Sequence, residues 1–187
     1  MVFKKLLLST FLFTGFLSAE NSIGIDINSK DVEILASINL NALTDYANGT
    51  TYILDLNYLH SDGDNMTRVG FLGQNTLQGV EGLTLSIGLK TVLADDFLAF
   101  PIMARGNYVL PLNGSIPTTS LALSLAYAPS ILTFLDGEDY TDISLELDME
   151  VISNIHIFTG YRNIKTNYTI IDKTFNNSFY GGIKLSF

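Results

Sequence analysis

The sequence predicts an all-β fold, an antiparallel transmembrane β-barrel of ten strands connected as an up-and-down meander. Three observations predict it. The 187-residue chain has a positive mean hydropathy of +0.29, yet beyond residue 19 no apolar run is long enough for a bilayer-spanning helix. Apolar and polar residues instead alternate in short segments, as in strands with one apolar face. The chain ends on such a segment, with Phe179, Gly181, Ile183, Leu185 and Phe187 on one side.

Residues 1–19 are predicted to be a cleaved signal peptide, and residues 20–187 to be the barrel domain. Lys4 and Lys5 precede an apolar run from Leu6 to Leu17, and Ala19 is a small residue before the expected cut. The run is shorter than the roughly 20 residues of a membrane-spanning helix. We therefore expect export through the Sec pathway to a bacterial outer membrane. The chain contains no Cys, which excludes a lipidated cysteine and a disulfide framework.

The charge balance excludes one class of partner. Beyond the signal peptide, eight Lys and Arg face nineteen Asp and Glu, a net charge of −11. A nucleic-acid-binding protein needs a basic face, so we expect no nucleic acid as partner. The sequence has no metal-ligand cluster, phosphate-binding glycine loop or nucleophile elbow. We expect no cofactor, and a monomer whose main contact is outer-membrane lipid.

Ten segments show the alternation expected of strands. The first covers residues 22–28, and the segment 97–109 contains Pro101, which predicts a bulge or strand start there. Both chain ends are expected in the periplasm, as is usual for such barrels, which requires an even number of strands and places the long loops 128–139 and 166–176 outside. An eight-stranded barrel is the alternative, with segments 22–28 and 66–74 lost or merged. The other predicted strands are 32–41, 50–60, 83–91, 119–127, 140–151, 154–165 and 177–187.

The hairpin from 140 to 165 has the best-determined register. A three-residue link, residues 152–154, pairs Val151 with Ile155 and continues upward to Leu145 with Tyr161, all on the lipid face. The acidic residues of the strand then face the barrel interior, the lumen. A slip of one residue would turn them toward lipid, where charge is penalised.

The penalty on charge at the lipid face also predicts that the other charged side chains of the strands face the lumen. Such a lumen is narrow enough for side chains to fill, and buried charges need partners. The leading interpretation is a charge-paired plug, in which the acidic strand pairs with Arg162 across the lumen and His156 with Glu150. The alternative is a narrow polar path. The predicted network consists of Asp55, Arg68, Lys90, Arg105, Glu146, Asp148, Glu150, His156, Arg162 and Lys184.

Aromatic residues are expected at both membrane interfaces. The terminal Phe with its alternating strand resembles the signal by which barrel-assembly machinery recognises outer-membrane proteins, carried here by Phe179, Ile183, Leu185 and Phe187. Tyrosines near strand ends suit the interfacial girdles of such barrels. They are Tyr52, Tyr58, Tyr108, Tyr127, Tyr140 and Tyr161.

We expect no enzyme activity. His60, Ser61 and Asp62 lie at the outer end of a predicted strand, where a His and a Ser could act on lipid. Adjacent strand residues point to opposite faces, however, so the three cannot converge on one atom. The Ser-Asp-Gly-Asp sequence is also ordinary turn composition.

Several short motifs occur in an order and at spacings that are similar to those of a known protein family. Tyr127-Ala-Pro-Ser130, Asp139-Tyr140, Gly160-Tyr-Arg162 and the terminal Phe-Tyr-Gly-Gly-Ile-Lys-Leu-Ser-Phe187 resemble the YfaZ family of small Gram-negative outer-membrane proteins. The resemblance extends from about residue 50 onward. It implies an outer-membrane barrel with no assigned biochemical role, and no catalytic residues are carried over.

Four functions follow as hypotheses. The leading one is a barrel with a plugged polar interior and a structural role, or one in surface interaction through its outer loops. In loop 128–139, the apolar run Ile131–Leu135 would pack over the barrel mouth or meet a partner or lipid. The alternative is a narrow porin for small solutes. Less favoured are an outer-leaflet lipid-modifying enzyme and a soluble lipocalin-like barrel.

Overall fold

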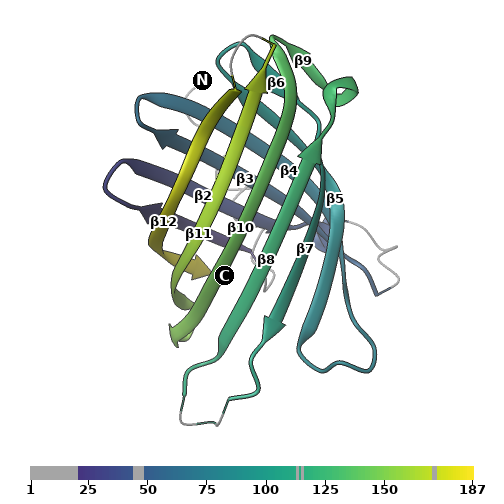
Figure 1. Ribbon diagram of the computed structural model, residues 1–187. Coiled ribbons are helices and arrows are strands. Elements are labelled where there is room, and N and C mark those ends of the chain that lie inside the picture. Colours follow the sequence, from purple (N-terminus) through teal and green to yellow (C-terminus); the bar gives the residue numbers. More distant parts are fainter. Residues whose placement is uncertain (1–20, 44–48, 113, 115, 170–171) are drawn as a thin grey trace, which may run out of the picture.

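The computed structural model describes residues 21–43, 49–112, 114, 116–169 and 172–187. The predicted signal peptide lies outside these residues. Within them, ten antiparallel strands form a closed up-and-down barrel (Figure 1), which confirms the predicted fold and strand number. The barrel strands are β1 (Ser22–Ile27), β2 (Asp31–Asn39), β3 (Thr51–Ser61), β4 (Asp64–Thr76), β5 (Leu83–Ala94), β7 (Ile102–Val109), β8 (Thr119–Ala128), β10 (Gly137–Ile152), β11 (Ile155–Tyr168) and β12 (Asp172–Ser186).

The first and last strands close the barrel. β1 pairs with β12 from Ser22 opposite Ser186 to Ile27 opposite Gly181. Beyond this ladder, Phe187 N–H donates to the Asn21 carbonyl at 2.9 Å, and Asn21 N–H donates to the Phe187 carbonyl at 3.2 Å. Both ends of the described chain therefore lie at one end of the barrel, called here the terminal end. The opposite end is called the far end.

Pro101 divides one predicted strand into two. Segment 97–109 forms β6 (Phe97–Ala99) and β7, with the break at Phe100 and Pro101. Proline lacks the N–H that a ladder needs, although its carbonyl accepts a bond from Lys90 N–H at 2.9 Å. The predicted loop 128–139 is also structured: the 3₁₀ turn η2 (Ser130–Leu132) leads into β9 (Thr133–Leu135), which pairs with β6. This short pair extends the wall at the far end.

The predicted loop 166–176 is mostly strand. β11 continues to Tyr168, and β12 begins at Asp172. A register shift explains why alternation missed this: Ile164 pairs with Asn176, whereas Lys165 pairs with Thr174. The extra residue, Phe175, interrupts the period of two, as a β-bulge does.

The predicted hairpin register is correct along most of its length. Ser144 lies opposite Arg162 and Glu150 opposite His156, with the predicted partners between them. The pairing of Val151 with Ile155 is wrong: the register shifts after Glu150, and Ile152 pairs with Ile155. The chain then turns within two residues, with Asn154 at a φ of 69°, a left-handed conformation that Asn tolerates.

Alternation gives the barrel an apolar outer face. Every barrel strand turns large apolar side chains outward, and one from each strand is between 37% and 67% exposed. Neither 3₁₀ turn, η1 (Leu40–Leu43) nor η2, nor any other helix in the described ranges could cross a membrane. The ten outward residues are Ile25, Ile34, Leu56, Phe71, Ile87, Ile102, Leu123, Leu145, Ile157 and Ile183.

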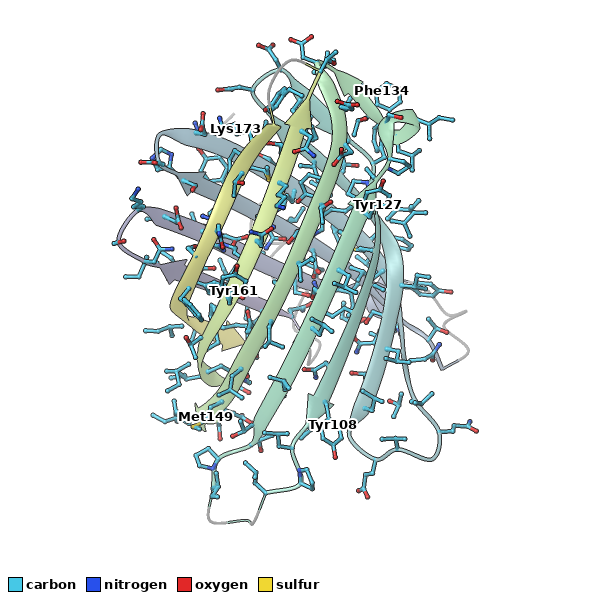
Figure 2. All side chains as sticks on the ribbon, in the orientation of Figure 1. Tyr108, Tyr127, Phe134, Met149, Tyr161 and Lys173 are labelled. Atoms are coloured by element: carbon cyan, nitrogen blue, oxygen red, sulfur yellow. The ribbon has the colours of Figure 1, made fainter. Side chains whose placement is uncertain are left out.

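The aromatic residues of the wall mostly face outward as well. Tyr127 is 54% exposed, and Phe134 lies beyond it toward the far end (Figure 2). Tyr161 stacks obliquely on Phe179, with ring centroids 5.1 Å apart. Tyr140 is an exception and corrects the prediction. Its ring is fully buried in the lumen. Tyr140 and Asp142 are two positions apart on one strand, so both side chains point inward.

The lumen is packed with apolar side chains at the far end. The buried core cluster draws on residues close to the far-end turns, and aromatic contacts such as Phe97 with Tyr168, at 5.4 Å, bind it together. We call this group the apolar plug. Its buried members near the far end include Leu59, Met66, Val92, Phe97, Tyr140, Ile164 and Phe175.

Candidate functional site: a charged lumen closed at one end

A network of buried charges lies next to the apolar plug, and Arg162 of β11 is its first centre. Its two terminal nitrogens donate to both carboxylate oxygens of Asp26 on β1, at 3.1 and 3.0 Å. Arg162 also donates to Glu33 on β2, and its Nε donates to Asn176 at 3.1 Å. The planar guanidinium group matches this bidentate geometry. The Arg162 side chain thus links its own strand, β11, to β1, β2 and β12.

Arg68 of β4 continues the network across the lumen. It donates to Glu33 and, at 3.1 Å, to Asp142 of β10. Asp142 also accepts from Lys90 Nζ at 3.0 Å and from the Tyr140 hydroxyl at 3.2 Å. We call the group Asp26, Glu33, Arg68, Lys90, Asp142 and Arg162 the ion-pair layer.

The ion-pair layer is buried and electrically balanced. Asp26 is 0% exposed, Glu33 2% and Arg162 3%, and three cations face three carboxylates. Each charge in such a site must be paired, because the cost of desolvation is otherwise not recovered. The chain of partners from Arg162 through Glu33, Arg68 and Asp142 to Lys90 meets this requirement. The layer and the plug together therefore pack this part of the lumen with buried side chains.

The lumen is hollow on the other side of this layer. A polar cavity of about 250 Å³ extends from this layer, whose six residues form part of its lining, to Ser22 near the terminal end. Small inward residues on four strands, Ser22, Ser37, Ser124 and Ser144, leave this space open. Charged side chains in the cavity are partly exposed: 30% for Arg105 and 26% for Lys184. This exposure, against almost none in the ion-pair layer, indicates a cup that opens at the terminal end.

Two glycines keep the aromatic rings of the cup against its wall. A Cβ on Gly160 would lie 2.6 Å from Cζ of Tyr180, and one on Gly182 would lie 2.5 Å from Cζ of Phe158. Real Cβ atoms do not approach that closely, and each would lie as close or closer to a backbone carbonyl oxygen of the neighbouring strand, at 2.5 Å for Leu145 and 2.2 Å for Ile25. Glycine at these positions thus allows the neighbouring strand and the aromatic ring to pack closely at the cup wall.

The structure divides the predicted charge network between the layer and the cup. Arg68, Lys90 and Arg162 belong to the ion-pair layer, and Asp55 binds Arg105 at 2.6 Å on the cup wall. Nearer the terminal end, Lys184 contacts Asp148 at 2.6 Å and lies 4.0 Å from Glu146. Glu150 accepts a bond from the Asn154 backbone at 3.0 Å, away from the others.

Two predicted pairings are wrong. Arg162 does not pair with the acidic residues of β10 but with Asp26 and Glu33, and His156 contacts Asp148 at 2.7 Å rather than Glu150. Barrel closure brings β1 and β2 past β12 toward Arg162, and a hairpin register does not reveal that approach.

Sequence reasoning missed Asp26, Glu33 and Asp142, which hold the ion-pair layer together. A signal was present: Asp26 lies between Ile25 and Ile27, and Asp142 precedes Ile143. Since the isoleucines face lipid, their neighbours must face the lumen. Strand parity would therefore have found all three.

The His60 and Ser61 side chains separate. Ser61 Oγ donates to Asp31 at 2.6 Å in the buried interior, whereas the exposed His60 ring contacts Asn65 at 2.8 Å. The His60 and Ser61 side chains therefore do not meet at this strand end. Among the residues that the structure describes, no group of three His, Asp or Glu side chains could hold a metal ion.

Comparison with solved structures found other barrels. The chain is similar to the KdgM porin, with a TM-score of 0.48 and 14% identity over 89% of this chain and 98% of that chain. It is also similar to the NanC porin, with a TM-score of 0.43 and 8% identity over 91% and 99%. No family model and no curated protein matches the sequence. The resemblance to the YfaZ family therefore stays a prediction.

Proposed function

We propose that this protein is an integral outer-membrane β-barrel with its terminal end in the periplasm. Its continuous apolar outer face supports this proposal, since such a band is what a barrel presents to lipid. The predicted signal peptide and the terminal Phe187 add the expected route of export and assembly. The polar interior is the inverse of a soluble ligand-carrying barrel, whose apolar face would be inside.

Its lumen is closed, and its role is structural or one of surface interaction. The single observation that carries this is the continuous ion-pair layer backed by the apolar plug, whose buried side chains pack the lumen between the cup and the far end. The far-end loop offers a contact surface, because Ile131 is 80% and Leu135 70% exposed. The YfaZ resemblance, with its expectation of no catalytic residues, is part of the same proposal.

A second candidate is a narrow channel for small solutes. The observation that favours it is the hollow half of the lumen, whose charged and hydroxyl side chains are typical of a pore lining. The plug and the ion-pair layer would then have to rearrange for conduction. In this case Arg105 and Lys184 would line the entrance on the periplasmic side.

Planar-bilayer conductance of the refolded mature protein separates the two candidates. Heat-modifiable migration on a gel first verifies that the sample is folded. We expect no discrete conductance steps from the wild type, because a buried ion-pair layer crosses the lumen. Steps that disappear on boiling the sample, and that change in size in Arg105→Gln but not in Lys173→Gln, would overturn the closed barrel and establish the channel.

A further inference from the structure

We propose that the cup binds a small zwitterion of the α-amino acid class, with its carboxylate at Arg105 and its ammonium group at Glu146. Entry from the periplasm rests on the proposed orientation of the barrel. Binding itself requires only the folded barrel, and it is independent of whether the barrel conducts.

Arg105 supplies the site for a carboxylate. Its Nε donates to Ser124 Oγ at 3.1 Å, and its Nη2 donates to Asp55 at 2.6 Å. Ser37 Oγ also donates to Asp55, at 2.9 Å, so both the guanidinium group and its counter-ion are held in place. Among the described residues, nothing hydrogen-bonds to the remaining nitrogen, Nη1. The side chain lines the cavity and is 30% exposed, so this donor is free for a carboxylate.

Glu146 supplies the complementary site. Its Oε2 accepts a hydrogen bond from the Tyr180 hydroxyl at 3.1 Å, which orients the carboxylate. Its Oε1 lies 4.0 Å from Lys184 Nζ, too far for a hydrogen bond. Lys184 lies closer to Asp148, at 2.6 Å. Glu146 therefore presents an oriented acceptor, 26% exposed, to the cavity.

The strand register places these two groups on one wall. Arg105 lies opposite Ser124, Ser124 lies opposite Ser144, and Glu146 is two residues farther along the same strand as Ser144. Two strand spacings and two residues separate the Cα atoms of Arg105 and Glu146 by roughly 12 Å. Both side chains line the cavity, so a ligand whose opposite charges lie on one short skeleton can approach both from the same space.

Size and charge narrow the ligand class. A cavity of 250 Å³ has room for about eight waters at roughly 30 Å³ each, so it suits a small solute. Its lining carries five carboxylates and five cations. Because the lining is neutral as a whole, a simple anion or cation gains no general attraction, whereas a zwitterion can use Arg105 and Glu146 together.

The test is a saturation-transfer NMR titration of refolded protein in detergent with three matched probes. Alanine carries both charges, lactate lacks the ammonium group, and alaninamide lacks the carboxylate. We expect alanine to bind. Lactate and alaninamide should each bind more weakly by about tenfold or more, because each leaves one charged partner in the cup unused. Equal binding of lactate and alanine would overturn the proposal in favour of a simple anion site, and no alanine signal from folded protein would overturn it outright.

Variants locate the site. Arg105→Gln and Glu146→Gln should each weaken alanine binding about tenfold or more, whereas Lys173→Gln, at a far-end ion pair with Asp64, should leave it unchanged. A charge variant that fails to fold is recognised by the loss of heat-modifiable migration on a gel. In that case Ser144→Leu is used instead, because it fills the cavity without removing a charge, and it should abolish binding. Wild-type affinity in folded Ser144→Leu would contradict the site. None of these results depends on conductance.

Discussion

Removing the Arg162 side chain tests the ion-pair layer most directly. Arg162→Met keeps most of the side-chain volume but removes four hydrogen bonds, two of them to Asp26. Glu33 retains Arg68 as a partner. Asp26, by contrast, loses its ion-pair partner while it stays fully buried. Breaking one side of a buried pair costs about 3–5 kcal/mol, because the other charge remains desolvated.

The free energy of unfolding should therefore fall by about 3–5 kcal/mol. Denaturant titration of protein folded in lipid vesicles, followed by far-ultraviolet circular dichroism, measures it. The matched control is Lys30→Met, since Lys30 and Asp62 form an ion pair 3.6 Å apart whose side chains are 67% and 76% exposed. Such surface pairs contribute less than about 1 kcal/mol.

A second substitution separates lost pairing from lost packing. Adding Asp26→Asn to Arg162→Met removes the orphaned charge, so the double variant should be more stable than Arg162→Met alone. The reasoning is refuted if Arg162→Met unfolds within about 1 kcal/mol of the wild type, or if Asp26→Asn lowers its stability further.

Three further predictions concern the wall. Leu123→Arg should destabilise the barrel in vesicles by about 2–4 kcal/mol, and Ile152→Arg, at the terminal-end turn, by about 1 kcal/mol or less; equal effects would contradict the position of the lipid belt. Gly182→Ala should abolish the heat-modified band on gels, because its Cβ would meet backbone and an aromatic ring, whereas Gly73→Ala has 3.5 Å of clearance and should fold. Phe187→Ala should lower the amount of protein in the outer-membrane fraction of cells while refolding in detergent is retained; unchanged amounts in cells would argue against an assembly signal at this residue.

The fold was predictable because its signal is local. Alternation with a period of two is a property of each strand by itself, so Ile23 and Ile25 predict an outward face without knowledge of any neighbour. The register of β10 and β11 was predictable too, because a short link limits the pairing and charge on the lipid face is penalised. The prediction failed where the period breaks, at the bulges beside Glu150 and Phe175.

The candidate site was only partly predictable. Parity alone assigns Arg105 and Glu146 to the lumen, and both lie there. It says nothing about which luminal charges meet, because each inward side chain can reach several strands. Arg162 and Asp26 are 136 positions apart, and they meet only after β12 has closed against β1.

The sequence by itself determined the strands, their two faces and the apolar outer surface, since these follow from residue order along each strand. Only the tertiary structure decided that the lumen has an apolar plug at one end, a paired charge layer beside it and a hollow cup at the other. The physical reason is that closing the barrel sets the relative heights of strands distant in sequence. Those heights determine which inward residues share a level, and hence which charges pair and where space remains.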